Sequence, residues 1–198
     1  KGIPYGEVVE VEQQLLDEGT LSQDEVLKFC DFHTLALEGH IDLSGLKIVP
    51  PGHPVDTFKK ENRGLEKVII QLNTKYSEAH SLKDEDTFSW FLGMKSLFNS
   101  LLDVEKHYLR KENLLFPYLE SYGITGPPKV MWGKHNEIRE LLRGAIEVLN
   151  AGGEISAGEA PTVVDLVLRP ASGAVKDMIG KEEQILLPMA TDRLTEAE

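Results

Sequence analysis

Residues 54–75 have the sequence PVDTFKKENRGLEKVIIQLNTK, and the positions of the apolar side chains decide the class of fold. With position 62 included, Val55, Phe58, Leu65, Ile69 and Leu72 are spaced 3, 4, 3, 4 and 3 residues apart. An α-helix brings residues three and four positions apart onto one side. The stretch therefore predicts a long amphipathic helix with one buried face, which we call its seam.

Three later stretches repeat this spacing. They predict helices over about residues 86–119, 128–149 and 161–189, separated by loops rich in glycine and proline at 123–128 and 151–158. Pro170 should kink the last helix, and Pro117 and Pro188 should bend or end theirs. Because strand patterns are weak throughout, the sequence predicts an all-α fold, an antiparallel four-helix bundle over residues 50–198.

Residues 1–49 form a separate region before Pro50-Pro51-Gly52. Apolar residues at 8, 11, 15 and 16 give one helical face, and Ser22 with Glu25 forms a capping box for a second helix. We therefore predict an N-terminal helical hairpin. Two such helices cannot bury a core alone, so the hairpin should dock on the bundle, and a homodimer could also form through it.

Composition excludes several classes of function. The 198 residues carry a net charge of −12 and are 41% apolar, which suits one packed core but not the neutralisation of nucleic-acid phosphates. No apolar run reaches the roughly 18 residues of a membrane span. A single cysteine and the absence of a signal peptide favour the cytoplasm. Since the chain starts at Lys1, we expect it to be a fragment or a processed product.

Three seam positions are polar: Asn62, His135 and Glu182. Burying such a group without compensation costs about 1–3 kcal/mol when it is neutral, and more when it is a carboxylate. A bundle with several of these groups must pair them, hydrate them or bind an ion between them. Their presence on three of the four helices predicts a site.

An internal repeat supports this prediction. Residues 107–117, HYLRKENLLFP, align without gaps with residues 178–188, MIGKEEQILLP. His107 and Glu112 are five residues apart, about 140° around a helix, so they flank the seam and both can lean inward. Imidazoles and carboxylates on facing helices are how bundles bind metals. Iron is the natural occupant of such a mixed set, and manganese or zinc could compete with it.

Four strings in order, GHPVDTFKKENRGLE, HYLRKENLLFPYLE, MWGKHNEIREL and KEEQILLPMA, resemble a haemerythrin-type (HHE) cation-binding domain over residues 53–194. They are similar to a branch in which a domain of unknown function precedes the bundle and a PAS-type sensor domain commonly follows. The strings EVVEVEQQLLDEG and LKFCDFH resemble the end of that N-terminal domain.

The resemblance implies a non-haem iron centre, often di-iron, that binds dioxygen or senses oxygen, nitric oxide, iron or redox state. It also implies the ligands: His107 and Glu112 from the second helix, His135 from the third, and Glu182 or Glu183 from the fourth. His53 lies at the start of the first helix, either in the site or as a helix cap. These six residues are the candidate metal ligands.

The chain also departs from the family pattern. Met178 stands where the fourth-helix histidine belongs, Lys111 where many members have a glutamate, and Asp56 where this branch often has a second histidine. Asn62 falls near the usual first-helix ligand, and Arg139 replaces another histidine. The remaining residues could hold one metal, an unusual carboxylate-rich pair of metals, or none.

Two functions therefore compete. In the first, the bundle binds iron and a small gas ligand, and acts in oxygen, nitric oxide or redox sensing within a larger signalling protein. In the second, the metal site is lost and the bundle is a structural or protein-interaction module. An enzyme is not expected, because nucleophile, phosphate-loop and zinc-protease motifs are absent from the sequence.

Overall fold

The computed structural model describes residues 47–195, together with residues 3, 4, 11, 14, 18, 25, 41 and 42. The predicted N-terminal hairpin therefore lies almost wholly outside the described residues, although Val11, Gln14 and Glu25 are helical. Two short parallel strands, β1 (Ile3–Pro4) and β2 (Ile41–Asp42), pair with Ile3 opposite Ile41.

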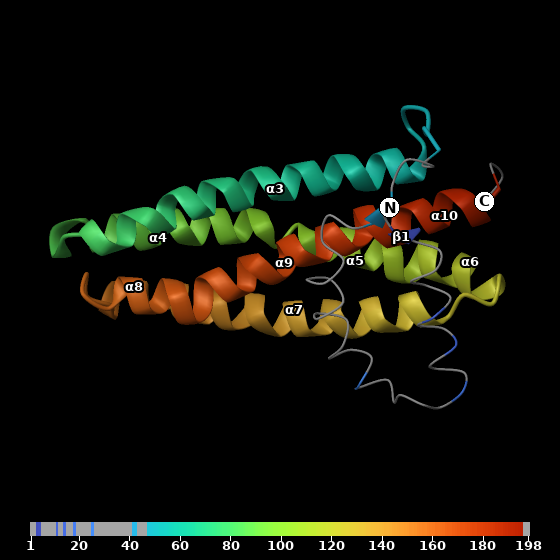
Figure 1. Cartoon of the computed structure of the whole chain (residues 1–198). Coiled ribbons are helices and arrows are strands. Elements are labelled where there is room, and N and C mark those ends of the chain that lie inside the picture. The colour runs from blue at the N-terminus through green and yellow to red at the C-terminus, as the bar shows by residue number, and fades with distance from the viewer. Residues whose placement is uncertain are drawn as a thin grey trace. The chain divides into compact units, whose positions relative to one another are not determined.

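Four helical stretches lie where the spacing predicted them (Figure 1). The first is α3, and the second is α4 followed by α5, a π-helical turn η2 and α6. The third is α7, and the fourth runs from α8 through a π-turn η4, α9 and a π-turn η5 to α10. Their bounds are α3 (Pro54–Glu78), α4 (Asp84–Leu101), α5 (Val104–Arg110), η2 (Lys111–Leu115), α6 (Phe116–Ser121), α7 (Gly126–Asn150), α8 (Ala160–Val163), η4 (Val164–Leu168), α9 (Arg169–Lys181), η5 (Glu182–Leu186) and α10 (Leu187–Arg193). Two 3₁₀ turns, η1 (Ala79–Ser81) and η3 (Gly152–Glu154), follow α3 and α7.

The helical class is confirmed, and so is the burial of the seam. Val55, Phe58, Leu65, Ile69 and Leu72 are all at most 7% exposed. The three polar seam residues Asn62, His135 and Glu182 are each 0% exposed, so they truly occupy core positions. None of the described helices has the length and apolarity needed to cross a bilayer.

One boundary was predicted wrongly. We expected a continuous helix over about residues 86–119, but α4 ends at Leu101 and α5 begins at Val104. The amide of Lys106 bonds to the carbonyl of Asp103 at 3.2 Å, so a new helix starts around this aspartate, a residue type that favours helix N-termini. The apolar spacing continues across the break, since Leu101 and Val104 are both buried.

The chain forms two compact units, and each contains part of all four helical stretches. Unit 1 comprises residues 1–59, 108–135 and 178–198, and unit 2 comprises residues 60–107 and 136–177. The core of unit 1 includes Phe58, Tyr108, Phe116, Met131 and Ile179. The core of unit 2 is built from residues such as Leu72, Phe91, Phe98, Leu142 and Val175.

Each proline that was expected to kink, bend or end a helix is preceded by a π-turn, and the helix continues beyond it. The amides of Phe116, Arg169 and Leu187 bond to the carbonyls of Lys111, Val164 and Glu182, five residues earlier. A proline cannot donate a backbone hydrogen bond, and its ring collides with the carbonyl four residues before it. The wider turn accommodates both constraints, and π-turns of this kind are frequent at functional sites.

Candidate functional site

The internal repeat is a structural repeat as well. The π-turns η2 and η5 begin at Lys111 and Glu182, which are equivalent positions of the aligned strings. Both side chains are 0% exposed, and the Lys111 ammonium donates a hydrogen bond to the Glu182 carboxylate. The two equivalent positions thus carry opposite charges and form a buried ion pair in unit 1.

The Lys111 ammonium has two further neighbours. His135 Nε2 lies 3.3 Å from Lys111 Nζ, and the ring centroid of Tyr108 lies 4.6 Å from it. A buried ammonium is stable only when acceptors replace the water it has lost. Here a carboxylate, an imidazole nitrogen and the electron-rich face of an aromatic ring surround the charge.

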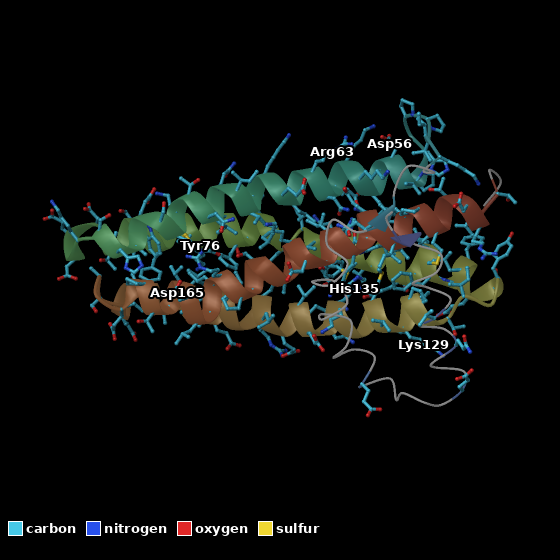
Figure 2. All side chains as sticks on the ribbon, in the orientation of Figure 1. Asp56, Arg63, Tyr76, Lys129, His135 and Asp165 are labelled. Atoms are coloured by element: carbon cyan, nitrogen blue, oxygen red, sulfur yellow. The ribbon has the colours of Figure 1, made fainter. Side chains whose placement is uncertain are left out.

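His135 lies on α7 (Figure 2). It joins this ion pair to a second carboxylate. Its Nδ1 lies 2.7 Å from Glu112 Oε1. Because a lysine ammonium can only donate, Nε2 must be the accepting nitrogen, and Nδ1–H must donate to Glu112. The imidazole is therefore neutral, with the tautomer assigned by its two partners.

Packing holds the imidazole in this state. The ring of Tyr108 stacks on His135 at a centroid separation of 3.8 Å, and the ring of Phe116 lies nearly parallel at 6.0 Å. Burial lowers the pKa of His135 to about 4, and the Lys111 charge acts in the same direction, against the opposing hydrogen bond and charge of Glu112 and the charge of Glu182. At neutral pH His135 is an uncharged acceptor.

His107 has a different carboxylate partner. Its Nδ1 lies 2.8 Å from Glu61 Oε2, and its side chain is 2% exposed. Both residues belong to unit 2, as does the buried Asn62. Glu61 is not among the residues that sequence reasoning selected, although it immediately precedes the polar seam residue Asn62.

The other candidates have separate places. His53 Nδ1 accepts a hydrogen bond from the Val55 amide at 3.1 Å, so His53 acts as the N-terminal cap of α3. Glu183 is half-buried, whereas its neighbour Glu182 is fully buried. Arg139 pairs with Glu105 at 2.8 Å, and Met178 lies in the core.

Of the six predicted ligands, three are joined around Lys111: Glu112, His135 and Glu182.

These donors do not fit a metal ion in the arrangement that the structure has. Glu182 and the Nε2 of His135 both accept from the Lys111 ammonium, so a dication would have to displace a cation already present. Within residues 47–195 and the eight described residues before them, no group of three or more histidine, cysteine, aspartate or glutamate side chains could hold a metal.

Lys111 is the residue whose importance the sequence prediction missed. It was noted as a departure from the family pattern and left out of the seam, which passed from Tyr108 to Leu115. Yet Tyr108, Lys111 and Leu115 have the same spacing of three and four as the other seam residues. That spacing, together with the repeat partner Glu182, is the signal that places Lys111 in the core.

Comparison with known families agrees with this architecture. Residues 53–190 match the family described as the Hemerythrin HHE cation binding domain, and residues 1–43 match a family of unknown function, DUF438. A search of curated proteins gave no match. Since the first match spans most of the sequence, the chain belongs to the hemerythrin HHE cation-binding domain family, with a DUF438 segment at its N-terminus.

Proposed function

We propose that this chain is a haemerythrin-type module of a larger signalling protein that works without a resident metal, as a structural or protein-interaction unit. One observation carries the proposal: the interior of unit 1 contains its own cation, the ammonium of Lys111, hydrogen-bonded to Glu182. Because this ammonium is part of the chain, the interior holds a positive charge without binding an ion from solution. No catalytic reaction is assigned to it.

Energetics support a lasting role for this ion pair. Removing one partner of a buried pair costs about 3–5 kcal/mol, because the remaining charge stays in a poorly solvated place. That is a large part of the 5–15 kcal/mol by which a typical domain is stable. Neither partner can therefore be removed alone without destabilising the module, and an ion that displaced the Lys111 ammonium would have to compensate the Glu182 carboxylate.

A second candidate, the iron-containing sensor of oxygen, nitric oxide or redox state, is favoured by a different observation. The two imidazole–carboxylate pairs, His135–Glu112 and His107–Glu61, resemble the way in which metal-bound histidines are oriented by a carboxylate on the second ring nitrogen. A neutral His135 is also in the protonation state that a ligand needs. This candidate requires the Lys111 ammonium to leave its place.

Elemental analysis separates the two candidates. The chain is purified aerobically and anaerobically, its metal content is measured, and its melting temperature is recorded with and without ferrous iron and a chelator. We expect no stoichiometric metal and an unchanged melting temperature. A ligand that binds only the folded state raises the melting temperature. Retained iron, with a melting temperature that chelation lowers by several degrees, would instead contradict the metal-free proposal and favour the iron-containing candidate.

A further inference from the structure

We infer that the outer face of α4 is a docking surface for a second copy of this chain, and that the α4 helices of the two copies cross there in opposite directions. The inference rests on the proposed protein-interaction role and deepens it by naming the partner. Four residues of unit 2 define the surface, which we call the α4 stripe: Glu85, Phe88, Leu92 and Lys95.

Exposed apolar side chains provide the first argument. The helix α4 (Figure 1) buries one face, which includes Phe91, Met94 and Phe98. On the other side Phe88 is 69% exposed and Leu92 is 58% exposed, and the two residues are one helical turn apart. Contact with another apolar surface would remove both side chains from water, which is favourable.

The scarcity of charge on α4 provides the second argument. Two copies of a chain with a net charge of −12 repel each other. In the sequence from Thr87 to Leu102, Lys95 is the only charged residue, although 27% of the whole chain is charged. A second acidic copy can therefore approach this segment without meeting like charge.

The order of residues along α4 provides the third argument. Glu85, Phe88, Leu92 and Lys95 are spaced 3, 4 and 3 residues apart, so they share one face and are symmetric about position 90. When a second α4 runs in the opposite direction, Phe88 meets the second copy's Leu92, and Glu85 meets its Lys95. A parallel arrangement would instead bring like charges together. A two-fold axis generates the antiparallel contact, because it repeats the same contacts in both copies.

The Glu85 carboxylate is accessible for this contact. Its side chain is 76% exposed, and its ion pair with Lys83, at 3.9 Å, is a surface pair of little strength. The neighbouring Asp84 has a different role, because its Oδ1 accepts a hydrogen bond from the Ala157 amide at 3.0 Å. The stripe thus has an exposed acid at one end and a lysine at the other.

Sedimentation of the full chain over a range of concentrations tests the association. A stripe of about three helical turns is smaller than the interface of a stable dimer, so we expect a dissociation constant on the order of 100 µM. Phe88→Ser and Glu85→Lys should each raise it at least about tenfold, the second by confronting lysines. Adding Lys95→Glu to Glu85→Lys should return it to within about threefold of the original, because opposite charges meet again.

Glu66→Lys is the matched control, since it makes the same change in net charge at an exposed glutamate of α3 and should leave the dissociation constant unchanged. A chain that stays monomeric up to about 1 mM would overturn the inference, at a concentration tenfold above the expected constant. So would a charge exchange that associates no better than Glu85→Lys alone.

A crosslink tests the direction of crossing. In a chain with Cys30→Ser, the exposed Ser89 and Ser96 are replaced one at a time by cysteine and treated with a short bismaleimide. In the antiparallel pair, the two copies of position 89 lie about 3 Å apart along the helix axes, and those of position 96 about 18 Å apart. We expect a crosslinked dimer from Ser89→Cys and not from Ser96→Cys, and equal yields would contradict the arrangement.

The remaining outcomes identify other causes. If the chain is monomeric and Phe88→Ser abolishes its binding to phosphatidylcholine vesicles, the stripe contacts lipid and the inference is wrong. A monomer without metal would overturn this inference and leave the proposed function standing. Stoichiometric metal would refute the proposed function whether or not the dimer forms.

Discussion

Both units contain a π-turn that precedes a proline, but the side chains around these turns differ in charge. The first residue of every π-turn is buried: Lys111 and Glu182 in unit 1, Val164 in unit 2. All four buried lysine and glutamate side chains of the described residues, Lys111, Lys134, Lys181 and Glu182, belong to unit 1. The π-turn thus does not make a site by itself; the side chain at its first position does.

At its π-turn η4, unit 2 pairs a buried polar group with neutral partners. Tyr76 Oη donates to the carbonyl of Leu168, the last residue of η4, at 3.0 Å, and Ser172 Oγ also lies 3.0 Å from Tyr76 Oη (Figure 2 labels Tyr76). Burial raises the pKa of Tyr76 to about 12, so the hydroxyl remains protonated well into the alkaline range. A carbonyl and two hydroxyls stabilise this turn without any buried charge.

The largest difference between the units should come from removing one charge of the pair. Lys111→Met is expected to lower the free energy of unfolding by about 3–5 kcal/mol, because the Glu182 carboxylate then stays buried after the ammonium has gone. Chemical denaturation measures the loss. Adding Glu182→Leu should recover most of it, since an apolar pair replaces the charged one. A double variant as unstable as the single one would contradict the pairing.

The next largest effect should appear in acid. The pKa of His135 is about 4 in the folded chain and near 6.5 in the unfolded one, so the unfolded state binds more protons between these values. Stability should therefore fall as the pH drops from 6.5 towards 4, by up to about 3 kcal/mol.

Denaturation at a series of pH values checks this. His135→Gln should remove this part of the pH dependence, whereas His80→Gln, at an exposed histidine, should leave it unchanged. An identical slope in all three proteins would mean that the titrating groups are elsewhere.

The neutral cluster of unit 2 should contribute less. Tyr76→Phe removes the hydroxyl that bonds to Leu168 and Ser172, and we expect a loss of about 1–2 kcal/mol in the free energy of unfolding. Tyr118→Phe, at an exposed tyrosine, is the matched control and should change stability by less than about 0.5 kcal/mol. A loss at Tyr76 as large as that at Lys111 would remove the contrast between the units.

The smallest effect should come from a partly exposed ion pair. Arg139 and Glu105 lie 2.8 Å apart, but their side chains are 24% and 43% exposed, so water and salt screen the pair. Glu105→Gln is expected to cost no more than about 1 kcal/mol, and less at high salt. Thermal melts at two ionic strengths provide the measurement, and a loss comparable with that of Lys111→Met would show that burial is not what distinguishes the Lys111–Glu182 pair.

Spacing along the chain predicted most of the fold. It placed the four helical stretches and the burial of Asn62, His135 and Glu182, because burial follows from the face of a helix on which a residue lies. It did not predict the break after Leu101, because the apolar spacing runs through it unchanged. The apolar spacing did not predict the π-turns either, although each of them directly precedes a proline-containing stretch that the sequence had singled out.

The site was harder to predict than the fold. Spacing gives the direction of a side chain around its own helix, but not its height relative to a residue on another helix. The repeat made Lys111 and Glu182 equivalent without indicating that they meet. The pairing of His107 with Glu61 depended on the same missing information. The resemblance to a metal-binding family also directed attention to histidines and carboxylates, and away from a lysine in their midst.

The ammonium at Lys111 has one more consequence, for how the molecule matures. Because the charged side chain is part of the polypeptide, every newly synthesised copy contains it. Folding of the core therefore requires no metal-loading protein and does not depend on which ions are available in the cell. Under the proposed function, all newly folded copies have the same charge in their core, whatever the supply of metal ions in the cell.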